Sequence, residues 1–223
     1  MCLILVAWKV HAAFPLVVAA NRDELHARPA SAAAFWPDHP EILAGRDLQA
    51  KGTWLGAARN GRFASVTNYK GGHDPNAAES RGALVTGYLL HSRSSESFTS
   101  EISKKKNSYS GFNLLLADQN ELWWLSNRGD GARKLAPGHY ALGNFLLDTP
   151  EVMEVKSRFE AAPVAIEPLF SLLAGAKIVA PVYGTRCSTV LLRGEDGRMQ
   201  FAERPFDPSG ADGSTLRYEF KAS

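Results

Sequence analysis

A cysteine directly after the initiator methionine is the first side chain of this 223-residue chain that can do chemistry. Removal of a methionine that precedes a small residue leaves a thiol and a free α-amine together on Cys2. Because an α-amine has a pKa of about 7.7–8.0, it can accept the thiol proton near neutral pH. The thiolate then attacks a carbonyl carbon. The competing interpretation makes Cys2 a small apolar residue in a buried strand.

A second group of chemically useful residues, "NRDE" at 21–24, ends an apolar stretch. Alternate residues of a strand share a face, which pairs Asn21 with Asp23 and Arg22 with Glu24. An arginine lowers the pKa of a nearby thiol, and a carboxylate can bind an ammonium group. The alternative is a solvated strand end with an internal salt bridge.

Two short apolar runs are needed to bring these groups together. Residues 2–8 and 14–20 are rich in branched side chains and only a few residues apart, so they favour a buried β-hairpin over helices. In an antiparallel hairpin, Cys2 starts one strand and residues 21–24 end its partner. The sequence therefore predicts that Cys2 lies beside "NRDE" in space.

Further polar residues stand at the ends of expected strands. Asn68 closes "RFASVTN", Asn144 closes "ALGN" and Arg186 opens "RCSTVLLR". A fixed, neutral asparagine amide is a good oxyanion donor, and an arginine can orient a carboxylate or a nucleophile. The alternative for each is a turn residue or a surface charge. Cys187 faces away from Arg186 in a strand, so we interpret it as a core residue and not as a partner of Cys2.

The remaining pattern is hairpins first, then helices, then strands again, which is typical of two antiparallel sheets with helices outside and not of alternating βα units. No glycine-rich phosphate loop follows a strand. The expected elements beyond the first hairpin are hairpins over 53–58 with 62–68 and 112–118 with 121–127, a helix over 81–91 capped by Ser80, a second helix and a loop within 92–110, a strand over 139–144, two helical segments within 151–174 broken by Pro163 and Pro168, and strands over 186–193, 199–206 and 216–220.

Composition narrows the class of protein. A chain with 45% hydrophobic residues and no linker suits a single domain over residues 1–223. The net charge of +2 without a basic stripe argues against a nucleic-acid partner, and the lysines at 104–106 read as a solvated loop. Histidines lack metal or covalent haem spacing. The oligomeric state stays open.

Location follows from the cysteines and the apolar runs. Two cysteines form no disulfide framework, which favours a reducing compartment. Lys9 and His11 interrupt the first apolar run, and no run reaches the roughly 18 residues of a membrane helix. We expect a soluble, cytoplasmic protein without integral membrane contact.

Taken together, the motifs resemble those of the NRDE family, also called the transport and Golgi organisation 2 family. The similarity spans nearly the whole chain. The shared pieces, in order, are Cys2, "AANRDE" (19–24), "GTWLG" (52–56), "TNY" (67–69), "RG" (81–82), "GFNLLLAD" (111–118), "YALGN" (140–144), "YGTR" (183–186) and "AER" (202–204).

This resemblance implies an N-terminal nucleophile (Ntn) hydrolase fold, a four-layer αββα sandwich of two antiparallel sheets flanked by helices. The family is similar to the choloylglycine and penicillin V acylases, which cleave linear amides. The implied roles are as follows: Cys2 as nucleophile with its amine as base, Arg22 steadying the thiolate, Asn144 as oxyanion donor with Asn68 in the same cleft, and Arg186 as a late arginine near the nucleophile.

One position departs from the acylase pattern. The acylases place the aspartate that holds the amine three residues after the arginine, where this chain has Leu25. Asp23 directly follows Arg22 and faces the opposite way in a regular strand. Either a bulge brings Asp23 back, or Asn21 or Glu24 takes its place.

Two functions follow as expectations. The first is a cysteine hydrolase that transfers an acyl group from a linear amide or thioester to water, acting on carbon–nitrogen bonds other than peptide bonds and needing no cofactor. The second is a non-catalytic carrier on the same scaffold. Its ligand is a small hydrophobic acyl or carboxylate compound, acyl-coenzyme A or non-covalent haem, because the family is linked to haem trafficking and lipid homeostasis.

Overall fold

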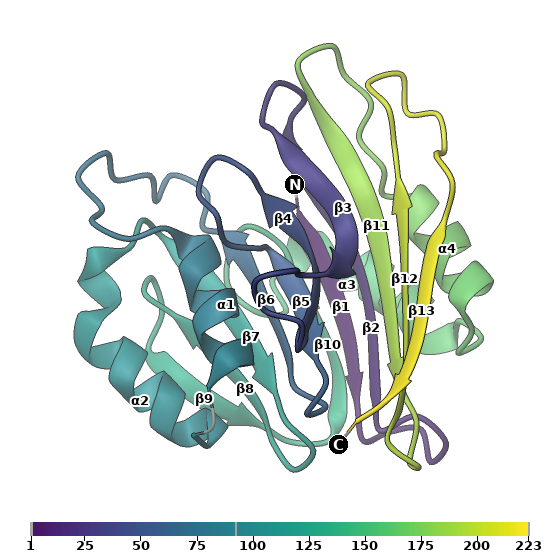
Figure 1. The fold of residues 1–223 in the computed structure, drawn as a ribbon, viewed down its shortest axis with the longest axis horizontal. Coiled ribbons are helices and arrows are strands. Elements are labelled where there is room, and N and C mark those ends of the chain that lie inside the picture. Colours follow the sequence, from purple (N-terminus) through teal and green to yellow (C-terminus); the bar gives the residue numbers. More distant parts are fainter. Residues whose placement is uncertain (1, 92, 223) are drawn as a thin grey trace. The chain divides into compact units, whose positions relative to one another are not determined.

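The computed structural model describes residues 2–91 and 93–222, and these form two compact units. The first unit contains residues 2–29, 137–143 and 147–222, and the second contains 30–136 and 144–146. Within the described residues, each unit has one antiparallel sheet with two α-helices packed on one face (Figure 1). The expected α+β class is confirmed. The single domain stays a prediction.

The sheet of the first unit has the strand order β10-β1-β2-β11-β12-β13, and all neighbours are antiparallel. Its elements are β1 (Leu3–Trp8), β2 (Leu16–Leu25), β10 (Gly138–Leu142), η2 (Pro150–Val152), α3 (Met153–Ala161), α4 (Ile166–Ala174), β11 (Tyr183–Arg193), β12 (Arg198–Pro205) and β13 (Leu216–Lys221).

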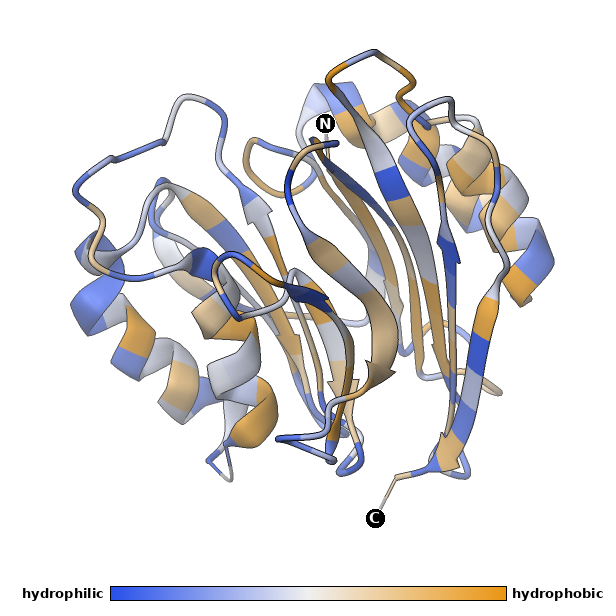
Figure 2. Cartoon of the chain, turned by 45° about the horizontal axis from the view of Figure 1, so that its top comes forward, coloured by the Kyte–Doolittle hydropathy of each residue, from blue (hydrophilic) through white to orange (hydrophobic). Residues whose placement is uncertain are grey.

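Burial explains the arrangement of these strands. Every residue of β1 is buried, which fits a strand that is apolar on both faces and lies inside a sheet. One face packs beneath α3 and α4, where Leu5 and Val190 meet Phe159 and Phe170. The edge strand β13 instead alternates apolar and charged residues along its length (Figure 2).

The predicted first hairpin is confirmed, and its second strand is longer than expected. β1 pairs with β2 in a register that sets Leu3 opposite Asn21. β2 continues to Leu25 because its last residues pair with β11, where Asp23 lies opposite Thr185. The "NRDE" residues therefore lie within the strand.

Proline 168 does not break a helix, so that part of the prediction was wrong. It lies in the first turn of α4, which begins at Ile166. A proline is tolerated there because the first backbone N–H groups of a helix have no intrahelical acceptor. Pro163 does separate α3 from α4.

The sheet of the second unit has the order β3-β4-β5-β6-β7-β8-β9, and both predicted hairpins are confirmed. Three strands, β3, β4 and β9, were not predicted, because their small or polar residues carry little strand signal. The elements are β3 (Ala30–Phe35), β4 (Ile42–Asp47), β5 (Leu55–Ala58), β6 (Phe63–Asn68), α1 (Arg81–Leu90), α2 (Ser95–Lys105), η1 (Lys106–Ser108), β7 (Phe112–Ala117), β8 (Leu122–Ser126) and β9 (Gly131–Leu135).

Two local features fix segments of the second unit that carry family motifs. Ser80 caps α1 as predicted, accepting a hydrogen bond from the backbone N–H of Gly82. Gly72 and Gly111 touch backbone to backbone, so a Cβ atom at Gly111 would lie 2.8 Å from the Gly72 Cα. The loop after β6 is therefore tied to the start of β7.

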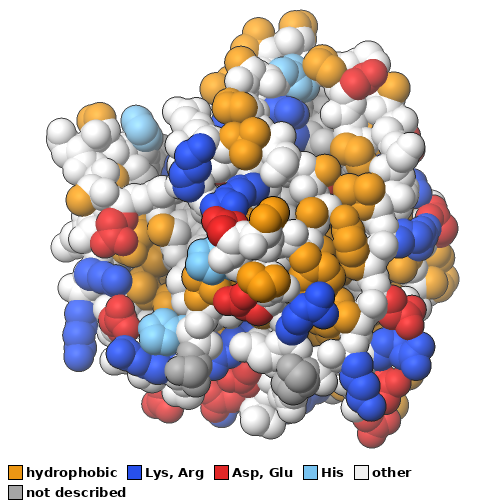
Figure 3. All heavy atoms as spheres, viewed as in Figure 1, with side chains coloured by type: hydrophobic (Ala, Val, Ile, Leu, Met, Phe, Trp, Pro, Cys, Tyr) orange, Lys and Arg blue, Asp and Glu red, His pale blue; other side chains and the backbone are white. Residues whose placement is uncertain are grey.

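Charged side chains of both signs are interspersed on the face shown in Figure 3. Within the described residues, no helix is long and apolar enough to cross a membrane.

Candidate active site

Cys2 lies immediately before β1, beside the end of β2. Its Sγ atom is 3.4 Å from the backbone nitrogen of Asp23, which donates to it, and 3.3 Å from the Asp23 carbonyl oxygen, which accepts the thiol hydrogen. The predicted proximity of Cys2 to the "NRDE" segment is therefore correct. The hairpin register alone produces it, because Leu3 is already opposite Asn21.

The electrostatic surroundings of Cys2 favour the neutral thiol. Burial raises its pKa from the ordinary 9.0 to about 11, and the negative charge of Asp23 acts in the same direction. The positive charge of Arg22 works against both. A base near the sulfur is therefore needed before Cys2 can act as a nucleophile at neutral pH.

Arg22 is buried on the sheet face opposite to α4. It pairs directly with Cys187 of β11, and directly paired residues share a face. The pKa of the buried Cys187 thiol is raised by burial and then by Glu203, whereas Arg22 lowers it. Both charges therefore act at one buried thiol, and Cys187 is a core residue as predicted.

Glu203, only 2% exposed, is a charged residue that sequence reasoning missed. It lies in β12 opposite Thr189, one strand away from Cys187. The "AER" motif contains Glu203 and is the sequence signal that could have pointed to it. A buried charge of this kind needs compensation by its surroundings.

Asp23 is buried and held by β11. Its carboxylate accepts a 2.6 Å hydrogen bond from the Thr185 hydroxyl, which in turn accepts one from the Ile178 backbone N–H at 2.8 Å. The register of β2 with β11 shifts between Thr185 and Cys187. A β-bulge or irregularity therefore lies next to the strand pair that holds Asp23. The expected bulge that turns Asp23 toward the face of Arg22 stays a prediction.

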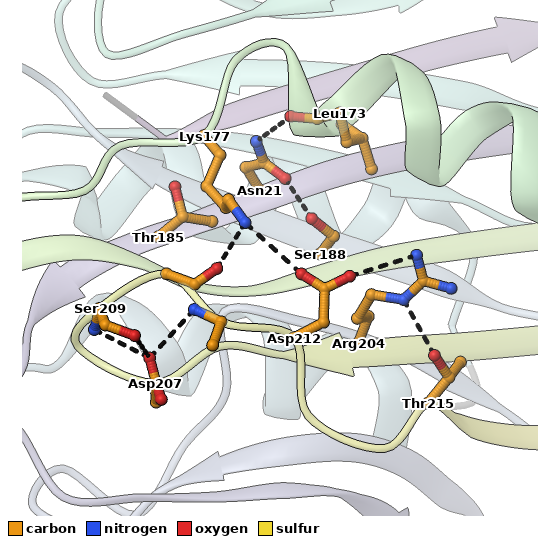
Figure 4. Close-up of polar contacts among 12 residues, drawn as sticks. Asn21, Leu173, Lys177, Thr185, Ser188, Arg204, Asp207, Ser209, Asp212 and Thr215 are labelled. Atoms are coloured by element: carbon orange, nitrogen blue, oxygen red, sulfur yellow. Dashed lines mark hydrogen bonds and ion pairs between the residues drawn. The ribbon is translucent and has the colours of Figure 1, made fainter.

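Asn21 serves the packing of α4. Its side-chain nitrogen donates to the Leu173 carbonyl at 3.0 Å, and its side-chain oxygen accepts from the Ser188 hydroxyl at 2.6 Å (Figure 4). Glu24 accepts a hydrogen bond from the backbone N–H of Leu25 and approaches Arg28 at 3.8 Å. Of these residues, Asp23 is the one whose charge acts on the Cys2 thiol. Which of the three holds the amine stays a prediction.

The connection between α4 and β11 is also fixed by Lys177. Its Nζ atom donates to the Gly210 carbonyl at 2.6 Å and lies 3.5 Å from Asp212 (Figure 4). Because Ile178 follows directly, this contact steadies the segment that supports Thr185.

Arg186 anchors a turn. Its Nη1 atom donates to the carbonyl oxygens of Leu25, His26 and Arg28, at 2.9, 3.1 and 3.2 Å. These contacts fix the chain directly after β2. The Arg186 side chain, expected near the nucleophile, therefore shapes the end of the strand that carries Arg22 and Asp23.

Tyr183, the first residue of β11, is a half-buried residue that sequence reasoning did not select. Its pKa is raised by burial, and next by the charges of Cys2 and Asp23. At neutral pH Tyr183 is therefore an uncharged phenol. The "YGTR" motif contains the signal that could have found it.

Asn68 and Asn144 come together in the second unit. The Asn144 side-chain nitrogen donates to the Asn68 carbonyl oxygen at 2.7 Å, and the Asn144 carbonyl accepts from the Lys70 backbone N–H at 2.7 Å. A primary amide nitrogen has two N–H bonds, and the contact with Asn68 uses one. The role of Asn144 as an oxyanion donor stays a prediction.

No group of three or more metal-ligating side chains occurs among the residues described.

The family model described as "Transport and Golgi organisation 2" matches residues 1–168, three quarters of the chain. The chain belongs to this family. The bovine transport and Golgi organization protein 2 homolog is 34% identical, over 94% of this chain and 93% of its own length. The motif resemblance is thereby confirmed for the transport and Golgi organisation 2 family.

Solved structures share the fold of this family member. A Caenorhabditis elegans ortholog of N-acylethanolamine-hydrolyzing acid amidase has a TM-score of 0.59 at 13% identity, over 86% of this chain and 92% of its own. The C2A mutant of conjugated bile acid hydrolase from Clostridium perfringens has a TM-score of 0.52 at 9% identity, over 100% and 98%. The chain therefore has an Ntn-hydrolase-like fold.

Proposed function

We propose that this protein is an Ntn-type cysteine hydrolase that cleaves a linear amide or thioester, with Cys2 as the nucleophile. The observation that carries the proposal is the position of the Cys2 Sγ against the Asp23 backbone, with the charges of Asp23 and Arg22 acting on it in opposite directions. Titratable groups set against one another in this way are typical of functional sites.

The reaction proceeds through an acyl-enzyme. The Cys2 thiol gives its proton to a base, and the sulfur attacks the substrate carbonyl to form a tetrahedral oxyanion. The oxyanion collapses, the bond to the amine or thiol breaks, and that leaving group takes the proton. Water then adds to the thioester, which releases the carboxylic acid and restores the Cys2 thiol.

The base in this scheme is the α-amine of Cys2 after removal of Met1, a residue outside the described part of the chain. An amine held near Asp23 is suited to the task, because the carboxylate favours the ammonium form that results from proton transfer. Arg22 offsets the thiolate charge, and Asn144 supplies an oxyanion donor.

The names of the two proteins with similar folds support an apolar carboxylic-acid derivative as the substrate class. They refer to N-acylethanolamines and to conjugated bile acids.

The test uses the two cysteines of the chain. Untagged protein, Cys2→Ala, Cys2→Ser and the control Cys187→Ala are incubated with decanoyl p-nitroanilide and with palmitoyl-coenzyme A. We expect release of nitroaniline or coenzyme A by wild type and Cys187→Ala, an intact mass without Met1, and a transient acyl adduct on Cys2. Equal turnover by both Cys2 variants and wild type would contradict the proposal.

A carrier is the second candidate, favoured by the raised pKa of Cys2, which keeps the thiol protonated and unreactive at neutral pH. It would bind an apolar carboxylate, acyl-coenzyme A or haem without turnover. Saturable binding of haem or palmitoyl-coenzyme A that Cys2→Ala leaves unchanged, in the absence of hydrolysis by wild type, would favour it. Absence of any saturable binding would exclude it.

A further inference from the structure

Asn113 is a buried polar residue in an apolar strand. It lies in β7, "FNLLLA", where every residue is buried, and its exposure is 0%. It stands directly between Thr67 of β6 and Ser126 of β8, which are also buried. The "GFN" part of the family motif contains Asn113, and the proposed hydrolysis gives it no task.

The amide nitrogen of Asn113 joins the two chain segments that carry the candidate oxyanion residues. It donates to the Phe145 carbonyl oxygen at 2.6 Å and approaches the Thr67 hydroxyl oxygen at 3.3 Å. Phe145 follows Asn144, and Thr67 precedes Asn68. One side chain therefore binds the backbone of the residue after Asn144 and the side chain of the residue before Asn68.

The carbonyl side of the same amide is unfavourable for folding. Its Oδ1 atom is buried, and no hydrogen-bond partner for it exists among the residues the structure describes. A buried polar atom without a partner lowers the free energy of unfolding, and an apolar residue of the same shape would avoid that loss. The contact with Phe145 thus comes at the expense of stability, a feature common at functional sites.

Phe145 needs this contact because the chain is irregular there. Residues 143–146 lie between the end of β10 and Leu147 without a regular strand or helix. The Asn113 bond to Phe145 and the contacts of Asn144 with Asn68 and Lys70 hold this segment from both sides.

We infer that Asn113 is a positioning residue: by holding the Phe145 carbonyl it fixes the direction in which the Asn144 amide points. The inference rests on the proposed function, in which Asn144 stabilises the oxyanion. Asn113 itself touches no reacting atom, and a displaced donor is enough to slow such a step.

Asn127 provides a matched control in the same unit. Its amide nitrogen donates to the carbonyls of Lys106, Tyr109 and Ser110, and its oxygen accepts from the Phe112 backbone N–H. Asn127 is a partly buried residue in the turn directly after β8, both ends of its amide have hydrogen-bond partners, and it holds a different segment.

The experiment compares Asn113→Leu with Asn127→Leu in the full chain. For Asn113→Leu we expect an unchanged or higher midpoint of urea unfolding, together with a fall in kcat of about 100-fold and little change in KM. Asn127→Leu should unfold at lower urea and keep its kcat while folded. A destabilised Asn113→Leu with unchanged kcat would show a merely structural asparagine and overturn the inference.

Hydrogen exchange separates this inference from the proposed function. In Asn113→Leu the backbone amides of residues 144–147 should exchange at least about tenfold faster, whereas those of β7 stay protected. If wild type turns over neither decanoyl p-nitroanilide nor palmitoyl-coenzyme A, the proposed function fails, and exchange still tests the positioning. Unchanged exchange at 144–147 overturns the positioning whatever the activity.

Discussion

The Thr185 hydroxyl donates a 2.6 Å hydrogen bond to the Asp23 carboxylate while its oxygen accepts one from the Ile178 N–H. Both residues are buried, so this bond stabilises a charge away from solvent. It also places the carboxylate whose charge acts on Cys2.

Replacing Thr185 by Val should therefore affect both folding and turnover. We expect a loss of about 2 kcal/mol in the free energy of unfolding, because a charged buried acceptor loses its donor. Turnover should fall at least about tenfold, because the acid is no longer held. Thr185→Ser should retain both properties. Urea denaturation and initial rates check this, and a valine variant equal to wild type contradicts it.

The Cys2 thiol should become reactive only at high pH, because its pKa is raised. In a Cys187→Ala background, the rate of alkylation by iodoacetamide with Met1 retained should rise with an apparent pKa of about 11. In Asp23→Asn that midpoint should move to lower pH, because a nearby negative charge no longer opposes the thiolate. A midpoint that stays in place would show that Asp23 does not act on the sulfur. Glu219→Asn, an exposed charge change in β13, is the control.

The same shift has a consequence for stability. The pKa of Cys2 is higher in the folded protein, about 11, than its ordinary 9.0, so the folded state holds the proton more tightly. This contribution is fully present below pH 9 and is lost as the pH rises from about 9 to about 11. Wild type should therefore lose more stability than Cys2→Ala over that range. Parallel urea midpoints of the two proteins would contradict this.

Close backbone contact between Gly72 and Gly111 leaves no room for a methyl group. Gly111→Ala should lower the free energy of unfolding by about 1–3 kcal/mol through overpacking. Gly87→Ala is the matched control, since its Cβ would meet only Phe98 at an ordinary 3.7 Å inside α1. It should be neutral or stabilising by up to about 1 kcal/mol. Equal effects of the two substitutions would disprove the packing argument.

Removal of the Asn144 side-chain amide should slow catalysis. If the protein turns over the acyl probes, Asn144→Ala should lower kcat by about 100-fold, the range for a lost oxyanion donor. Asn68→Ala should lower kcat far less, because Asn68 holds Asn144 through its backbone carbonyl oxygen. The reverse order of effects would assign the oxyanion to Asn68.

The sequence by itself determined the local arrangement around Cys2. The first hairpin has a short connection and two strands that are apolar throughout, so its register is strongly specified. That register alone sets Cys2 beside Asp23. Ser80 and the Asn-Gly turn likewise act through neighbours in the chain, and the structure has the helix and hairpin expected from them.

The tertiary structure decided which side chains serve chemistry and which serve packing. β11, some 160 residues further along the chain, brings Thr185 to Asp23 and Ser188 to Asn21, which gives these neighbouring side chains different partners. The burial of Glu203 and the clamp of Asn113 on Phe145 also join distant segments. The hydrophobic periodicity of a segment indicates only which face of that one helix or strand is buried. Pairings between strands far apart in the chain therefore become visible only in the folded protein.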